Sequence, residues 1–309
     1  MQYLAHWAKK LSWKDVAVSF RTSWEKVFKS IYYVVSWGLE HRDLSGITAI
    51  GVDEVLWHKN HKYITLVYQI NSECTRLLWI GKDRTEETFQ QFFDFLGKER
   101  VDLIEYICSD MWKPYLKIIK RNAKNAINIL DRYHIVARLN KALDKVRAEE
   151  HRQMKKDGYE PVLTKSRWLL LKNPLNLTEG QGAKLNDLLK YNLKSLRAYL
   201  LKEEFQLLWN YTSPAWAGKF IDNWTTKVMR SKIEPLKKEA QTIRRHKDLI
   251  LNWFRAKKSF NSGIVEGLNN KVKLTVRKSY GFRTLKCTEI ALYHTLGKLP
   301  EPPLTHKFY

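Results

Sequence analysis

The first 45 residues have the spacing of amphipathic helices. Apolar side chains recur there every three or four positions, which is typical of a helix with one buried face: Trp24, Val27, Phe28, Ile31, Val34 and Val35. Ser12 with Asp15 is expected to cap a first short helix, and Thr22 with Glu25 to form a capping box for the second. Two short helices joined by a tight turn predict either a helix-turn-helix or a plain helical hairpin.

From residue 47 onward the pattern changes to the alternation that strands require. Three such runs with short connections predict an antiparallel meander: residues 47–55, 63–70 and 75–80. A helix follows, with apolar positions at Phe89, Phe92, Phe93 and Leu96. Gly97 is expected to end that helix, because glycine is the usual residue at a helix C-terminus.

Two further strands alternate with helices. Residues 103–108 form a short apolar strand, and the next helix begins near Pro114, which suits a first helical turn. Residues 126–130 form a fifth strand, followed by a helix from about His134. The order of three strands, helix, strand, helix, strand and helix predicts a mixed five-stranded sheet with flanking helices. This order matches the ribonuclease-H-like α/β plan, in which the first and fourth strands are expected to be neighbours.

The remainder of the chain shows only helical spacing. Residues 149–258 contain no convincing strand and are expected to form an all-α insertion. A last helix is predicted over about residues 263–279, and the tail Pro300-Glu-Pro-Pro303 is expected to be extended. The predicted segments are a helical segment (1–45), the first part of the core (46–148), the insertion (149–258), and the last helix and tail of the core (259–309).

The charge of the chain points to a polyanionic partner. Lys and Arg number 55 against 32 Asp and Glu, so the net charge is +23. Residues 219–258 alone carry twelve Lys or Arg against four Asp or Glu, a difference of 12 − 4 = +8. Binding to nucleic acid explains this excess better than a merely basic surface, because each neutralised phosphate releases counterions. We therefore expect a nucleic acid as the partner.

Composition excludes several other classes. A hydrophobic content of 44% excludes a disordered chain, and no apolar stretch approaches the ~20 residues that span a bilayer. No secretory signal is expected from the first residues given, and the three widely spaced cysteines offer neither a disulfide framework nor a zinc site. No phosphate-binding GxxxxGK[ST] loop occurs, so no nucleotide cofactor is expected. We expect a soluble cytoplasmic protein that associates with the nucleoid when bound to DNA.

Three acidic residues occupy positions that suit metal-dependent chemistry. Asp53 lies within the first strand, Asp110 just after the fourth, and Glu266 at the start of the last helix. An acidic residue within an apolar strand is costly unless it is paired or binds a cation. Carboxylates suit Mg²⁺, with Mn²⁺ as a substitute, and two such ions promote in-line phosphoryl displacement. The alternative is structural: Asp53 in a salt bridge, Asp110 as a cap and Glu266 as a helix-dipole partner.

The last helix also predicts an edge that faces DNA. Four polar residues share a stripe with Glu266 at +3, +4, +7 and +11: Asn269, Asn270, Lys273 and Arg277. The adjoining stripe is apolar and is expected to be buried: Val265, Leu268, Val272 and Val276. We expect Lys273 to steady a phosphate near the metal ions.

Other polar residues have a weaker case for function. Asp131 is expected to cap a helix, with a place near the metals as the alternative, and His134 to be a structural residue or a DNA contact. A turn role for His58 and His61 outweighs metal binding. Glu54 is expected on the opposite face of the strand from the residue before it, because successive strand side chains alternate.

A set of motifs from about residue 47 to the C-terminus carries a family resemblance. They are Gly51-Val-Asp-Glu54, Ser109-Asp-Met-Trp112, Asp131-Arg-Tyr-His-Ile135, Lys172-Asn-Pro-Leu-Asn-Leu-Thr178, Leu201-Lys-Glu-Glu-Phe205, Val265-Glu-Gly-Leu-Asn-Asn-Lys-Val-Lys273, Tyr280-Gly-Phe-Arg283 and the tail ending Thr305-His-Lys-Phe308. Together they resemble the ISL3 (ISL-three) family of bacterial insertion-sequence transposases. The resemblance implies a ribonuclease-H-like catalytic domain whose Asp-Asp-Glu triad corresponds to Asp53, Asp110 and Glu266. The separations, 110 − 53 = 57 and 266 − 110 = 156, fit a helical insertion before the Glu.

The resemblance also implies an activity. The family would use two Mg²⁺ ions, hydrolyse double-stranded DNA at the ends of the element and join the freed 3′-hydroxyl to target DNA. It would act as an oligomer on paired ends. Family members usually carry a cysteine-rich zinc-binding region ahead of the helix-turn-helix, and its absence after Met1 suggests a truncated copy with impaired end recognition. Two alternatives stay open: a ribonuclease-H-like nuclease that cuts DNA without joining it, and a DNA-binding remnant or regulator without catalysis.

Overall fold

The chain folds into two compact units. The computed structural model describes residues 2–58, 62–258, 263–279 and 281–303. One unit comprises Met1–Asn128 together with Asn261–Tyr309, and the other comprises Ile129–Phe260. The second unit is thus inserted into the first.

The first unit contains a mixed five-stranded sheet. Its strands are β1 (Ala49–His58), β2 (Lys62–Ile70), β3 (Thr75–Lys82), β4 (Tyr106–Ser109) and β5 (Ile127–Leu130). Their spatial order is β3-β2-β1-β4-β5, in which β2 is antiparallel to β1 and β3 while β4 is parallel to β1. The predicted meander and the predicted adjacency of the first and fourth strands are both confirmed.

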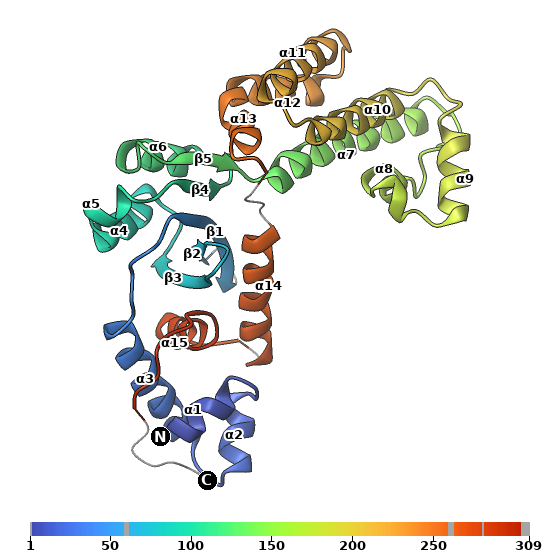
Figure 1. Cartoon of the computed structure of the whole chain (residues 1–309). Coiled ribbons are helices and arrows are strands. Elements are labelled where there is room, and N and C mark those ends of the chain that lie inside the picture. The colour runs from blue at the N-terminus through green and yellow to red at the C-terminus, as the bar shows by residue number, and fades with distance from the viewer. Residues whose placement is uncertain (1, 59–61, 259–262, 280, 304–309) are drawn as a thin grey trace. The chain divides into compact units, whose positions relative to one another are not determined.

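Helices cover the two faces of this sheet (Figure 1). They are α4 (Glu86–Leu96), α5 (Lys98–Val101) and α6 (Lys113–Asn122) on one side, and α14 (Gly263–Lys278) on the other. Ile50 and Val52 of β1 join the core formed with α4 and α6, whereas Gly51 faces Val265 of α14. Since side chains alternate along a strand, Asp53 lies on the α14 face.

The N-terminal segment forms three helices: α1 (Gln2–Ala8), α2 (Trp13–Ser19) and α3 (Trp24–Glu40). Ser12 caps α2, as predicted. The cap of α3 is Ser23 rather than Thr22, and the Ser23 hydroxyl accepts a hydrogen bond from the backbone N–H of Lys26. Thr22 belongs instead to the preceding turn, where its N–H donates to the carbonyl of Ala17. The shift leaves two helices joined by a tight turn, which fits both predicted arrangements.

A helix that the spacing did not predict follows α14. This helix, α15 (Leu285–Leu296), starts at a Thr284 cap and packs against α3, α14 and β3. Its Ile290 joins the apolar core of α1, α2 and α3. Buried residues lie on several sides of α15, so it lacks the single apolar stripe by which a surface helix is detected.

The second unit is helical apart from the end of β5, as far as the structure describes it, so the predicted all-α character is confirmed. Its α-helices are α7 (Arg132–Lys156), α8 (Arg167–Leu171), α9 (Glu179–Leu188), α10 (Lys194–Gln206), α11 (Pro214–Arg230), α12 (Glu234–Arg245) and α13 (Lys247–Arg255). Helix α7 runs without a break through position 149, where the insertion was expected to begin, and it packs on α10 and α12. Of the helices described, none has both the length and the apolar content needed to cross a membrane.

Candidate active site

The register of β1 and β4 brings two acidic residues to one edge of the sheet. These parallel strands pair Gly51 with Cys108. Asp53 and Asp110 each lie two residues beyond that pair, so they follow the shared ladder at the same level. Asp110 comes directly after β4, and its Oδ1 accepts a hydrogen bond from the backbone N–H of Trp112 at 2.8 Å. The carboxylate is thereby oriented in the turn before α6.

Helix α14 holds the Asp53 carboxylate. The Asn269 amide donates from Nδ2 to Asp53 Oδ2 at 2.5 Å, and the Tyr68 hydroxyl donates to Asn269 Oδ1 at 2.7 Å. Burial, followed in effect by the charge of Asp53, raises the pKa of Tyr68 well above its usual value, so Tyr68 remains a donor. Asn269 is only 6% exposed. Asn269 was predicted to face DNA, but its amide instead binds Asp53 and Tyr68 within the protein.

Glu266 lies in the first turn of α14, next to the point where the helix meets β1. A Cβ placed on Gly51 would lie 2.5 Å from Val265 Cγ2, so this close approach requires glycine in β1. Glu266 follows Val265 and is exposed. Three further members of the predicted edge are also exposed: Asn270, Lys273 and Arg277. The exposed side of α14 thus carries one carboxylate followed by two basic residues.

A basic residue that no sequence pattern marks lies between two carboxylates. Arg84 Nη1 lies 2.7 Å from Glu54 Oε1, and its Nη2 lies 3.9 Å from Asp110 Oδ2. The guanidinium carbon lies 4.3 Å from the centre of the Trp112 ring, which holds it in place. Glu54 is directed to Arg84 and away from the α14 face, as the alternation predicted. Sequence spacing gave no signal for Arg84 beyond a basic residue after β3.

The donor set at this edge suits a hard divalent cation. Asp53, Asp110 and Glu266 offer only oxygen ligands, which Mg²⁺ and Mn²⁺ prefer and which are a poor match for zinc. Among the residues described, no group of three or more His, Cys, Asp or Glu is arranged so as to hold a metal ion. The structure therefore places the first two carboxylates on adjoining strands and the third on the neighbouring helix, without closing them around a common point.

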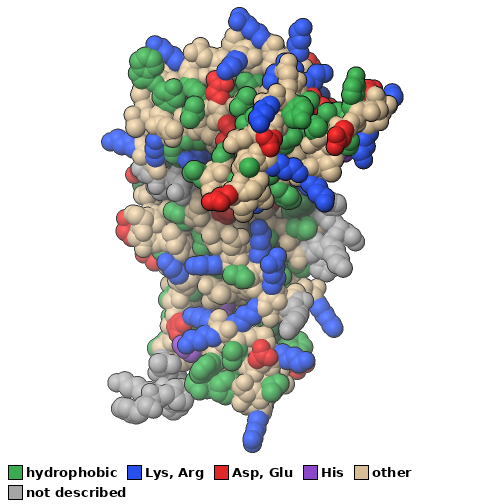
Figure 2. Space-filling view, turned by 90° about the vertical axis from the view of Figure 1, so that its right-hand side faces the viewer, with side chains coloured by type: hydrophobic (Ala, Val, Ile, Leu, Met, Phe, Trp, Pro, Cys, Tyr) green, Lys and Arg blue, Asp and Glu red, His purple; other side chains and the backbone are tan. Residues whose placement is uncertain are grey.

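The weaker candidates have local roles. The Asp131 side chain caps α7 by accepting a hydrogen bond from the backbone N–H of Tyr133 at 2.7 Å, as predicted. His134 Nε2 lies 3.6 Å from Asp131 Oδ2, one turn along the same helix. His61 and the side chain of His58 lie outside the described part of the chain. Lys and Arg side chains are scattered over the face of the molecule shown in Figure 2, and they are not confined to one segment.

Comparisons with known proteins give a consistent result. Residues 50–292 match the model of a family described as Transposase, of the ISL3 type. The transposase for insertion sequence element IS1001 of Bordetella parapertussis is 34% identical over 243 residues, which are 78% of this chain and 59% of that protein. The transposase for insertion sequence element IS1557 of Mycobacterium tuberculosis is 26% identical, over 96% of this chain and 69% of that protein. The chain thus spans less than two thirds of the length of the first of these relatives.

Proposed function

The chain belongs to the ISL3 family of transposases, and from this premise we propose that it cuts DNA at the ends of an insertion sequence and joins the freed 3′-hydroxyl to target DNA. One observation supports this most directly: Asp53 and Asp110 follow neighbouring parallel strands at the same level, while α14 carries Glu266 next to its contact with β1. Family membership implies a divalent metal. In the proposal, Asp53, Asp110 and Glu266 are both the catalytic and the metal-binding residues.

The proposed site holds two Mg²⁺ ions, for which Mn²⁺ substitutes. Asp53, Asp110 and Glu266 would hold such ions, which would supply activation of the attacking oxygen and stabilisation of the leaving oxygen in an in-line displacement. The protein's own part is to orient the ligands. Asn269 holds one oxygen of Asp53, and the Trp112 N–H holds one oxygen of Asp110. Arg84 balances the charge of Glu54 and Asp110.

The exposed side of α14 is proposed to face DNA. Lys273 lies two turns after Glu266 on the same side of the helix, and Arg277 lies one turn further. These side chains neutralise backbone phosphates, while Asn270 offers an amide to the strand beside the reacting bond. A homo-oligomer acting on paired ends would complete the assembly in the bacterial cytoplasm, with no nucleotide cofactor.

The test is cleavage and joining by Asp110→Asn with Mg²⁺ or Mn²⁺, beside the parent protein and Asp131→Asn as a matched control. Asparagine keeps the acceptor for the Trp112 N–H but removes the charge, so Asp110→Asn should abolish metal-dependent cleavage and leave DNA affinity nearly unchanged. Asp131→Asn keeps the cap of α7 and should cleave like the parent.

The outcomes separate the alternatives. Unchanged cleavage by Asp110→Asn would remove Asp110 from the site. Cleavage by the parent without joined products would favour a nuclease, and DNA binding by the parent without any cleavage would favour a DNA-binding regulator.

A further inference from the structure

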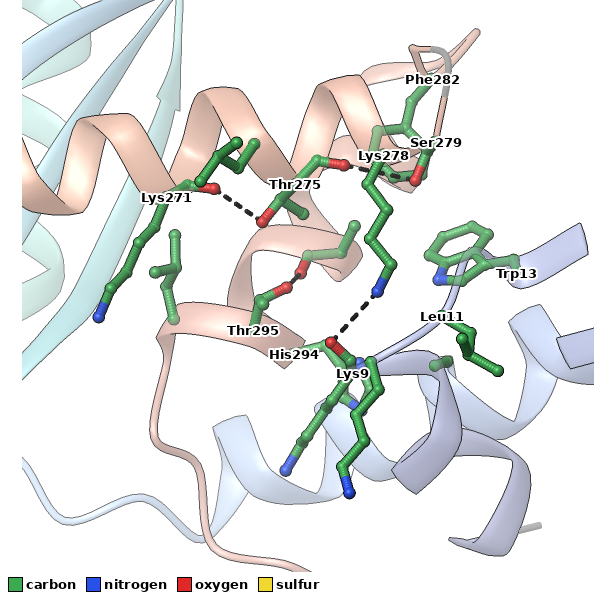
Figure 3. A pocket seen from close by; sticks show the side chains of 15 residues that line it. Lys9, Leu11, Trp13, Lys271, Thr275, Lys278, Ser279, Phe282, His294 and Thr295 are labelled. Atoms are coloured by element: carbon green, nitrogen blue, oxygen red, sulfur yellow. Dashed lines mark hydrogen bonds between the residues drawn. The ribbon is translucent and has the colours of Figure 1, made fainter. Parts of the chain in front are cut away.

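A cavity lined by lysines lies at the opposite end of α14 from Glu266 (Figure 3). Its volume is about 370 Å³, which falls in the range of roughly 300–1,000 Å³ found for ligand sites. Residues from the end of α1, the loop after it, α14 and α15 line the cavity. Its basic lining residues are Lys9, Lys10, Lys271, Lys278 and His294, and no Asp or Glu is found among the described residues that line it.

Lys278 and His294 are the least exposed of these basic residues. Lys278 Nζ donates to the backbone carbonyl of Lys9 at 3.2 Å, which is drawn as a dashed line in Figure 3. An ammonium group has three donors, so this hydrogen bond uses one of them. His294 is 8% exposed, and its Nε2 is buried without a hydrogen-bond partner among the described residues. A buried polar atom of this kind is costly unless a ligand or water completes it.

The charge around the cavity is not balanced. Lys9 pairs with Glu301 at 2.7 Å, and Asp15 is the acidic residue that acts on Lys278. Among the described residues, the four lysines that line the cavity thus have two acidic partners, Glu301 and Asp15. Burial, followed by the charge of Lys9, lowers the pKa of His294 to about 4, so the imidazole is neutral near pH 7. The excess of positive charge attracts an anion.

One wall of the cavity is aromatic, which narrows the class of anion. The rings of Trp13 and Phe282 lie 5.0 Å apart, centre to centre, and both line the cavity. The same two rings also line a second cavity, of about 480 Å³, together with Lys14 and Arg283. Cationic side chains beside aromatic rings are typical of surfaces that neutralise a nucleic-acid phosphate and contact its sugar or base.

We propose that this cavity binds a backbone phosphate of the DNA on which the active site acts, an inference that rests on the proposed function. Lys278 lies 278 − 266 = 12 residues after Glu266, which is about 18 Å along a helix axis. Five base pairs of duplex rise by about 17 Å. These two lengths are similar, so a duplex bound at Glu266 is long enough to extend to the cavity, although Lys278 is turned by about 120° around the α14 axis from Glu266.

The experiment measures affinity for a 30-base-pair duplex at several salt concentrations, using the full chain. The cavity variant is the double substitution Lys271→Gln and Lys278→Gln. The matched control is Lys98→Gln with Lys120→Gln, which removes the same charge from exposed positions of the same unit. We expect the cavity variant to lose about tenfold in affinity at physiological salt. The slope of log K against log salt should become shallower by about 1, because one phosphate contact is lost, and the control should change much less.

The single variant Lys271→Gln keeps the test valid if loss of the Lys278 hydrogen bond disturbs α1. The Lys271 side chain is exposed, and no hydrogen bond from it is seen in the described structure. Its affinity should fall by a few fold, with unchanged circular dichroism. Equal affinities of the cavity and control variants would overturn the proposal.

Two further measurements distinguish failure of the cavity proposal from failure of the proposed function. Inorganic phosphate alone is titrated while the ¹⁵N resonances of the His294 ring are followed. A shift there, with equal duplex affinity of the two double variants, would assign the cavity to free phosphate and overturn the DNA assignment. If the parent cleaves DNA and the two double variants have the same duplex affinity, only the cavity proposal is overturned. If the parent neither binds nor cleaves the duplex, both proposals are overturned.

Discussion

Asn269 ties the helix that carries Glu266 to the strand that carries Asp53. Its amide nitrogen donates to the Asp53 carboxylate, and its amide oxygen accepts the hydroxyl of Tyr68 from the next strand. Asparagine suits this position because one side chain both donates and accepts. The network orients an acidic side chain that would otherwise rotate at the sheet edge.

Asn269→Ala should therefore impair the site more than DNA binding. The change leaves a buried tyrosine hydroxyl and a carboxylate each short of a hydrogen bond, which costs about 1–3 kcal/mol in the free energy of unfolding. Cleavage should fall by at least tenfold, while duplex affinity stays within about twofold. Asn270→Ala, one residue along and exposed, is the control for stability. Parent-like cleavage by Asn269→Ala would show that Asp53 needs no such support.

Gly51→Ala should separate α14 from β1. The new methyl group would lie 2.5 Å from Val265 Cγ2, and overpacking of this kind costs about 1–3 kcal/mol. The displaced helix should also lower the cleavage rate, because Glu266 follows Val265 directly. Adding Val265→Ala should restore part of both losses. Urea denaturation and cleavage of the two single variants and the double variant check this, and additive losses would contradict the proposed contact.

Arg84 and Glu54 should stabilise the fold only while both charges are present. Their side chains are 29% and 12% exposed and lie 2.7 Å apart. Arg84→Gln leaves the Glu54 carboxylate without this partner and should lower the free energy of unfolding by about 2 kcal/mol. Adding Glu54→Gln removes that charge as well, so the double variant should be more stable than Arg84→Gln alone. A double variant that is less stable would indicate that Asp110 is the more important partner.

His294 should make stability depend on pH. Its pKa is lowered from 6.5 to about 4 in the folded chain, by burial first and then by Lys9. Between these values the unfolded state binds more protons, so stability is full above about pH 6.5 and falls as the pH is lowered to about 4, by about 3 kcal/mol in all. The other groups that act on it are Lys278 and His6, which lower its pKa, and Glu301, which raises it.

The measurement is denaturation of the parent and His294→Gln at pH 7 and pH 5. The parent should lose more stability between the two values than the variant does. Equal losses would mean that other groups carry the pH dependence.

Several features of the fold and the site follow from local chemistry and were predicted correctly. The period of two located the meander, and cap preferences located Ser12, Gly97 and Asp131. The strand order then placed Asp53 and Asp110 on neighbouring strands. These signals depend on spacing and backbone geometry within a few residues, so no distant contact was needed to interpret them.

Tertiary packing decided the rest. The position three residues after Glu266 lies at the border of two helical stripes, so the close approach of α14 to Gly51 determines that Asn269 is buried. Arg84 acquires its partners only because the segment after β3 brings it within reach of Glu54 in β1 and Asp110 after β4. Helix α15 has neighbours on several sides, so no single apolar stripe marks it. The sequence by itself determined the strands, their neighbours and the helices that carry a single apolar stripe. The side-chain partners and helix α15 were decided by which surfaces meet, because burial and pairing depend on residues far apart in the chain.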